Sequence, residues 1–488
     1  MNLLRTKSVE QSIADTDEPG RQLKKALGPL DLTVFGVGVI IGTGIFVLTG
    51  VAAGTVAGPA VSLSFVAAGI ACALAALCYA EFASTVPVAG SAYTFSYASL
   101  GELVAWIIGW DLMLELALGA ATVASGWSGY LRTVFHDTFH VTLPAWVDGN
   151  HHNLVAAALV LALTAVLCLG IRVSNAVNAV IVVVKVAIVL LVIVAGFTLV
   201  KTGNWNHFIP ASGSKAAPGG SSETTLIQDI GLGSGTFGVG GIFTAAALVF
   251  FAFIGFDIVA TAAEETKRPQ RDIPIGIFAS LGICTVLYVL VSLVVTGMVP
   301  YSKIDVNAPL ARAFDTVGES GIAQVVSWGA LAGLTTVTLI LMLGQSRVFF
   351  AMSRDRLLPP VFASVSERFQ TPYRTTLVTG VAVAVLAALV PLKTLADLVN
   401  IGTLFAFVVV ALGVIVLRRT RPDLERAFRT PAVPLIPILS VLASVYLMLN
   451  LTTTTWLRFL VWMAVGLVVY FLYGARHSRL AADKGSAQ

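Results

Sequence analysis

Apolar residues occur in long runs along this chain, and most polar residues fall between the runs. The runs at 155–169 and 180–200 lack the apolar–polar alternation that is typical of β-barrel strands. About 20 apolar residues cross a bilayer as a helix, so the pattern predicts an all-α integral membrane protein. We expect 12 transmembrane helices, at about 31–57, 59–83, 95–130, 153–171, 174–200, 237–264, 273–299, 322–352, 374–391, 394–418, 432–452 and 456–474.

Composition supports this class of protein. Apolar residues make up 57% of the chain, charged residues make up 11%, and the mean hydropathy is +0.89. A soluble chain of this length needs more charge to cover its surface, so lipid must solvate much of this one. The N-terminal segment has no apolar core followed by a cleavage site, and a signal peptide is not expected.

The positive charges predict the orientation in the membrane. Of the 30 Lys and Arg residues, 22 lie in segments on the side of the two termini and 7 lie on the other side. Cytoplasmic segments carry the excess of positive charge in membrane proteins. We therefore expect a multi-pass plasma membrane protein with cytoplasmic N- and C-termini. No loop is long enough for a soluble catalytic domain, and no binding of nucleic acid is expected.

Two of the predicted spans contain glycine at mid-depth. The first reads Gly42-Thr43-Gly44 at its centre, and the sixth contains Gly255 two residues before Asp257. Glycine leaves a helix without a Cβ clash, so both spans are predicted to be broken. Spans one and six are five apart, as in two five-helix repeats of inverted topology.

This symmetry predicts the organisation of the chain. We expect a cytoplasmic N-terminal segment, a first repeat, an extracellular loop, a second repeat, two further helices and a cytoplasmic tail, at 1–30, 31–200, 201–236, 237–418, 419–474 and 475–488.

A broken helix exposes main-chain groups in the membrane. The N–H groups that begin one half-helix attract a carboxylate, and the C=O groups that end the other half attract an ammonium group. Two facing breaks would therefore suit the head group of an α-amino acid. The alternative is that Gly38 and Gly42 form a close contact between two intact helices.

Three ionisable residues lie within predicted spans. Lys185 is roughly 15–18 Å along its helix from either end, too far for its side chain to reach water. Because burial disfavours the charged amine, Lys185 is a candidate proton carrier. The alternative is a permanent salt bridge with Glu115 or Asp257. Those two carboxylates could instead bind a cationic substrate, or serve as internal hydrogen-bond acceptors.

The remaining chemistry-bearing residues predict no catalytic site. His136, His140, His151 and His152 share one outer loop, where solvated histidines are commoner than a metal site. The four cysteines lie in apolar segments and fit no metal motif. The chain has no Walker loop, nucleophile elbow or HExxH pair. We expect neither an enzyme nor a cofactor other than the proton.

Several motifs resemble those of the amino acid–polyamine–organocation superfamily. Two of them are Ile41-Gly-Thr-Gly-Ile-Phe46 and Tyr79-Ala-Glu-Phe-Ala-Ser-Thr-Val-Pro-Val-Ala-Gly-Ser-Ala-Tyr93. Others resemble the cationic amino acid transporter family, including its bacterial ApcT-like members: Phe250-Phe-Ala-Phe-Ile-Gly-Phe-Asp257, Ala263-Glu-Glu-Thr-Lys-Arg-Pro-Gln-Arg-Asp-Ile-Pro274, Ala351-Met-Ser-Arg-Asp-Arg-Leu-Leu-Pro359, Val399-Asn-Ile-Gly-Thr-Leu-Phe-Ala-Phe407, Phe428-Arg-Thr-Pro-Ala-Val-Pro434 and Thr455-Trp-Leu-Arg-Phe459.

The resemblance implies a LeuT-like fold, a 5+5 inverted repeat with two extra helices. It implies that amides around Gly42, Thr43 and Gly44 bind the substrate carboxylate. It also implies that Phe251 gates the site from outside and that Lys185 takes the place of a sodium ion. The α-ammonium would meet carbonyl groups of Ile40, Phe251, Ala252 and Ile254.

These expectations converge on proton-coupled symport of an L-amino acid into the cell, either cationic or small and neutral. The alternatives are an amino-acid exchanger without proton coupling, an intramembrane enzyme and a sensor that binds without transport. The sequence does not indicate a partner subunit.

Overall fold

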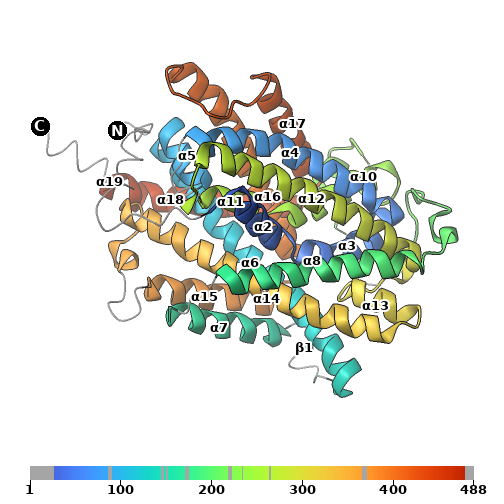
Figure 1. Cartoon of the computed structure of the whole chain (residues 1–488). Helices are drawn as coiled ribbons and strands as arrows, with labels where there is room; N and C mark the ends of the chain where they lie inside the picture. Colours follow the sequence, from blue (N-terminus) through green and yellow to red (C-terminus); the bar gives the residue numbers. More distant parts are fainter. Residues whose placement is uncertain are drawn as a thin grey trace, which may run out of the picture.

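The computed structural model describes residues 27–85, 91–142, 144, 148–149, 152–170, 175–217, 223–233, 235–262, 265–364 and 371–478. Long helices lie side by side in one bundle, with α5 and α19 near one end and α13 near the other (Figure 1). The principal helices are α2 (Pro29–Ile40), α3 (Thr49–Ala52), α4 (Val61–Thr85), α5 (Ser91–Ser99), α6 (Glu102–Phe139), α7 (Leu154–Cys168), α8 (Asn175–Phe197), α9 (Leu226–Asp229), α10 (Gly238–Val249), α11 (Phe256–Thr261), α12 (Pro269–Met298), α13 (Pro309–Thr316), α14 (Ser320–Arg354), α15 (Tyr373–Leu389), α16 (Leu392–Thr420), α17 (Leu435–Leu449), α18 (Thr453–Val469) and α19 (Ala475–His477).

Shorter helical turns connect or extend these helices. They are the π-helical η1 (Gly44–Leu48), η2 (Ala53–Ala57) and η9 (Tyr470–Gly474), and the 3₁₀ turns η3 (Gly58–Ala60), η4 (Thr202–Trp205), η5 (Phe250–Phe253), η7 (Tyr301–Lys303) and η8 (Pro360–Ala363). Two strands, β1 (Asp148–Gly149) and β2 (His152–Asn153), pair antiparallel in a loop. The other regular elements of the described residues are helical, as predicted.

Eight helical stretches within the described ranges are long and apolar enough to cross a membrane. Four shorter apolar helices accompany them: α2, α7, α15 and α17. Together they overlap the stretches predicted to be helical, although Gly44–Thr85 forms one continuous helical stretch where two spans were predicted. Large apolar side chains also point outward, for example Val183, Val194 and Phe197 of α8, which are 66%, 68% and 71% exposed. Such a surface suits lipid and not water.

The structure differs from the predicted third span. We expected one helix at about 95–130, but α5 is a separate helix and α6 begins only at Glu102. Gly101 lies between them with a φ of +98°, a conformation that L side chains rarely adopt and that ends a helix. Helix α6 continues to Phe139, beyond the predicted end. The amphipathic α13 was not predicted, because we assigned its residues to a loop.

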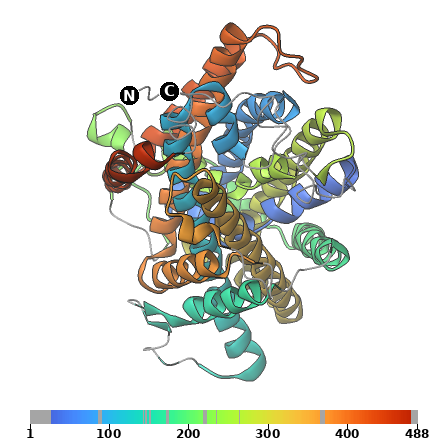
Figure 2. The same ribbon diagram turned by 90° about the vertical axis from the view of Figure 1, so that its left-hand side faces the viewer.

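Helix α6 is central to the bundle, where it packs against α14 and α16. Helix α4 packs against α12, and α7 packs against α15. Viewed along the bundle, α17 and α18 (orange-red and dark red) lie at its edge (Figure 2). This arrangement leaves α2, η1, η5 and α11 near the middle.

Candidate functional site

The first broken span separates into α2 and the turn that begins at η1. Helix α2 ends at Ile40, and Ile41 is extended, with φ −71° and ψ 97°. The next helical turn starts at Thr43 and Gly44, and it has no side-chain N-cap. Phe46 N donates to Gly42 O at 3.2 Å, so the N–H groups that begin this turn without such an acceptor are those that precede Phe46, including Thr43 and Gly44. The break lies at the predicted position.

The second broken span separates α10 from α11. Helix α10 ends at Val249, and η5 follows it. Ile254 is extended with ψ 133°, and Gly255 has a φ of +119° before α11 begins at Phe256. Only glycine adopts this φ without strain, which explains why the break falls here. A Cβ on Gly255 would also lie 2.6 Å from a methyl carbon of Val39.

The two breaks meet in the middle of the bundle. A Cβ placed on Gly44 would overlap the backbone of Ala252. The backbones of the two broken spans are therefore in direct contact, without an intervening side chain. Main-chain bonds join the same spans near their ends. Leu27 N donates to Glu265 O at 3.0 Å, and Phe237 N donates to Val56 O at 2.7 Å.

A small cavity opens at this crossing. Its volume is about 20 Å³. That is enough for about one water, so the site is contracted and must widen to admit a larger molecule. Its lining is Val39, Ile40, Gly42, Thr43, Gly44, Glu115, Leu116, Gly119, Val123, Phe251, Ile254, Val337 and Leu341.

The cavity brings together seven of the ten predicted site residues, which are Ile40, Gly42, Thr43, Gly44, Glu115, Phe251 and Ile254. Ala252, Asp257 and Lys185 are absent from the lining. Ala252 lies directly behind it, against Gly44. Residues of both breaks line the cavity, together with aliphatic residues of α6 and α14.

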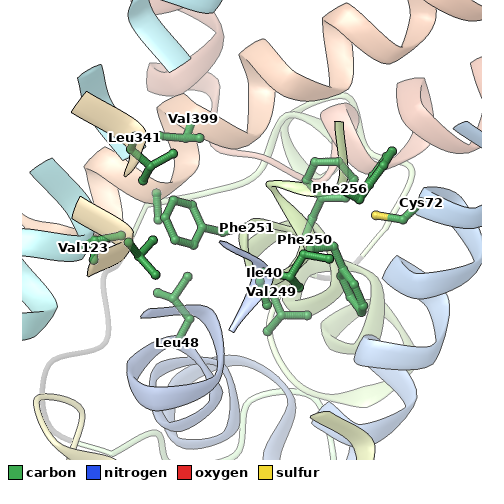
Figure 3. Packing of buried hydrophobic residues seen from close by; sticks show 14 of the residues in the cluster. Ile40, Leu48, Cys72, Val123, Val249, Phe250, Phe251, Phe256, Leu341 and Val399 are labelled. Carbon is green, nitrogen blue, oxygen red and sulfur yellow. The ribbon is translucent and has the colours of Figure 1, made fainter. Parts of the chain in front are cut away.

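Phe251 projects across the cavity. Its ring points toward Val123, Leu341 and Val399, whereas Phe250 and Phe256 lie on the other side of the chain, toward Cys72 (Figure 3). Phe251 thus reaches from the broken span to α6, α14 and α16, and its side chain is only 6% exposed.

Lys185 is almost fully buried, at 1% exposure, and its Nζ donates to Gly38 O at 2.7 Å. Within the described part of the chain, no carboxylate lies within 4.0 Å of this amine. The salt bridge with Glu115 or Asp257 is therefore not formed in this conformation. The lysine contacts the end of α2 instead, two residues before the helix stops.

Asp257 caps the half-helix that contains it. Its carboxylate accepts a hydrogen bond from Gly255 N at 3.2 Å, and the amides of Asp257 and Ile258 also face it. This matches the second interpretation from the sequence, an internal acceptor. The carboxylate is not part of the cavity wall.

Glu115 does face the cavity. Its neighbour Thr403 lies within hydrogen-bonding distance, while Oε2 has no partner among the described residues. Asp111, one turn earlier on α6, is fully buried, and neither of its carboxylate oxygens has a partner in the same part of the chain. Two buried carboxyl groups with open acceptor atoms usually mark water or a ligand.

Two residues at the site were not predicted. The Tyr288 hydroxyl of α12 lies 2.7 Å from Ile40 O and 2.9 Å from Ala252 O. The Asn400 amide of α16 donates to Ala247 O and Leu248 O, at 2.8 and 3.0 Å. Both satisfy carbonyl groups that a broken helix leaves open. A polar side chain inside an apolar span was the available signal in each case.

The predicted outer histidine loop shows no metal site among the described residues. His136 Nδ1 lies 2.6 Å from Asp137 Oδ1, and Arg312 of α13 binds the same carboxylate at 3.4 Å. His151 lies outside the described residues. The four cysteines are free.

The fold and its site define a helical membrane protein built around two interrupted spans. The chain matches the amino acid permease family over residues 27–473. It is 45% identical to the methylthioribose transporter of Bacillus subtilis (strain 168) and 47% identical to the branched-chain amino acid permease BcaP of the same organism, covering 98% of this chain and 99% of each relative. It is 33% identical to human cationic amino acid transporter 4, covering 98% of this chain and 90% of that one.

The chain therefore belongs to the amino acid permease family, within the superfamily that its motifs indicated. These relatives are named as transporters and permeases, which places the chain with transporters and not with enzymes.

Proposed function

We propose that this protein carries neutral aliphatic L-amino acids into the cell together with a proton. The observation that carries the proposal is the crossing of two broken spans at one buried cavity. The substrate carboxylate binds the uncapped amides of Thr43 and Gly44, and the ammonium group binds carbonyls of Ile40, Phe251 and Ile254. This pairing uses the opposite partial charges of the two helix ends.

The wider proposal is a twelve-span protein with a LeuT-like 5+5 inverted repeat and two extra helices. The pairing of helices supports it, because α4 packs on α12, α6 on α14 and α7 on α15. In a five-helix repeat, these are spans two and seven, three and eight, and four and nine. Helices α17 and α18 at the edge are the two extra spans. The 22-to-7 distribution of positive charge supports cytoplasmic termini in a plasma membrane.

The cavity lining supports a neutral aliphatic side chain. Val39, Leu116, Val123, Val337 and Leu341 contribute aliphatic residues to its lining, and Glu115 is the only ionisable one among the described residues that line it. The relative named for branched-chain amino acids is consistent with this choice. A protonated Glu115 would be compatible with such a substrate, whereas an ionised Glu115 would favour a cationic one.

Uptake by proteoliposomes under an imposed pH gradient tests this function. We expect accumulation of labelled leucine, isoleucine or valine when the outside is acidic, and none after the gradient is collapsed. The screen includes arginine, lysine, alanine and methylthioribose, because the relatives are named for cationic amino acids and for methylthioribose. Counterflow without any pH response would identify an exchanger, and binding without flux would identify a sensor.

Lys185 is the proposed proton carrier. Its amine holds the carbonyl of Gly38, so loss of its proton changes a bond at the end of α2. We expect Lys185→Ala to lose pH-driven accumulation by more than tenfold while amino-acid exchange remains measurable. Lys185→Arg, which stays protonated, is the matched control and should also fail to accumulate. Full, pH-dependent accumulation by Lys185→Ala would rule out this role.

A further inference from the structure

Tyr288 connects the two breaks through a single hydroxyl group. The oxygen lies 2.7 Å from Ile40 O, the last carbonyl of α2, and 2.9 Å from Ala252 O in η5. These residues are 212 positions apart in the chain, yet one donor reaches both of their carbonyl groups. No other described side chain bonds to both broken spans in this way.

The tyrosine ring is held firmly in place. Tyr288 is fully buried, and its ring packs at 5.4 Å from Phe65 of α4 and at 5.4 Å from Phe253 of η5. Phe65 and Phe253 also pack on each other. A ring fixed by two aromatic neighbours fixes the position of its hydroxyl, and therefore the spacing of the two carbonyls it binds.

Tyr288 does not line the cavity, but one of its partners, Ile40, does. A carbonyl oxygen has two lone pairs, so Ile40 O can accept from Tyr288 and from an ammonium group at the same time. Without the hydroxyl, the ends of α2 and η5 would each relax toward other partners. The hydroxyl thus acts on the substrate through the main chain.

We propose that Tyr288 is a positioning residue that aligns the carbonyl groups of both broken spans on the α-ammonium of the substrate. This inference rests on the proposed transport of amino acids and names the residue that prepares the site for their common cationic group. The ligand chemistry is a primary ammonium adjacent to a carboxylate.

The first experiment needs no substrate. Hydrogen exchange is measured on the full-length protein in detergent for wild type, Tyr288→Phe and Tyr470→Phe. Tyr470 is the matched control, because its buried hydroxyl binds Glu102, remote from both breaks. We expect Tyr288→Phe to raise exchange about tenfold at residues 42–46 and 253–258 together, as the loss of one hydrogen bond predicts. Unchanged exchange at either break overturns the proposal.

The second experiment measures binding and uptake. For leucine, we expect Tyr288→Phe to raise KM about tenfold with little change in the maximal rate, and Tyr470→Phe to change neither. Competition by 4-methylpentanoate, which lacks the ammonium group, should be the same in wild type and Tyr288→Phe. Equal losses for both compounds would show a general packing role and overturn the assignment.

The experiments distinguish a failure of the proposed function from a failure of the role assigned to Tyr288. If wild type binds no amino acid, the proposed function and this inference both fall. If wild type transports leucine while Tyr288→Phe matches it in KM, only the role of Tyr288 falls. If 4-methylpentanoate does not compete with wild type, the exchange measurement and the KM decide.

Discussion

The two broken spans differ in what binds the N–H groups at the start of their second half-helix. In span six, Asp257 lies on the half-helix that it caps, and its carboxylate accepts from Gly255 N. In span one, the turn that begins at Thr43 and Gly44 has no side-chain cap. One break is therefore closed to an external carboxylate, and the other is open to it. The comparison supports the proposal that the anion of the substrate binds span one.

The carbonyl ends of the breaks differ as well. The end of α2 is held by groups from two other helices, Lys185 of α8 and Tyr288 of α12. The end of α10 is held by Asn400 of α16. Among the described residues, a lysine amine binds the carbonyl end of span one and none binds that of span six, which puts the proposed proton-dependent step and the proposed carboxylate site on the same break.

The largest expected effect comes from adding a side-chain atom where the two breaks are in contact. In Gly44→Ala the new Cβ would overlap the backbone of Ala252, and neither chain can move aside without disturbing its break. We expect uptake to fall more than a hundredfold. Gly203→Ala is the control, because a Cβ there meets nothing within 4 Å. Normal uptake by Gly44→Ala would show that the spans are not in contact during transport.

A smaller effect is expected when the internal cap is weakened. Asp257→Asn keeps the shape but loses the charge that binds the amides of α11, at a cost of about 1 kcal/mol in stability. We expect uptake of leucine, and of arginine where wild type carries it, to fall by the same factor, about tenfold, with a lower melting temperature. A selective loss of arginine transport would instead mean that Asp257 contacts the substrate.

The smallest effect is expected at the open break. Thr43 is fully buried, and its hydroxyl has no partner among the described residues. Thr43→Val preserves the shape, so stability should be unchanged or slightly raised. If the hydroxyl supplements the amides in binding the carboxylate, affinity for leucine should fall about three- to tenfold in a direct binding assay. Unchanged affinity would mean that the backbone amides bind the carboxylate without help from the Thr43 hydroxyl.

Glycines and charges made part of this site predictable. Gly44, Gly255 and Asp257 sit at mid-depth in apolar runs, where local sequence alone indicates a break. Lys185 is conspicuous for the same reason. The locations of both breaks were confirmed, because a helix interruption depends on neighbouring residues. The roles of these residues in binding and proton transfer stay predictions.

Tyr288 and Asn400 could not be assigned in the same way. Their partners lie 248 and 153 positions away along the chain, and hydrophobic periodicity does not determine which helix faces which carbonyl. Likewise, an apolar pattern that continues through Gly101 did not separate α5 from α6. The sequence therefore predicted where the two helices break, but not which distant side chains bind the carbonyl groups at the breaks.

The main-chain contact at Gly44 and Ala252 has an evolutionary consequence. In the proposed binding mode, the parts shared by every α-amino acid contact peptide groups, which mutation of side chains leaves largely untouched. The parts that distinguish one amino acid from another would contact Val39, Val123, Leu341 and their neighbours in the cavity lining. Substrate specificity can thus diverge between related transporters by substitution of a few aliphatic residues, while the binding of the amino-acid head group is retained.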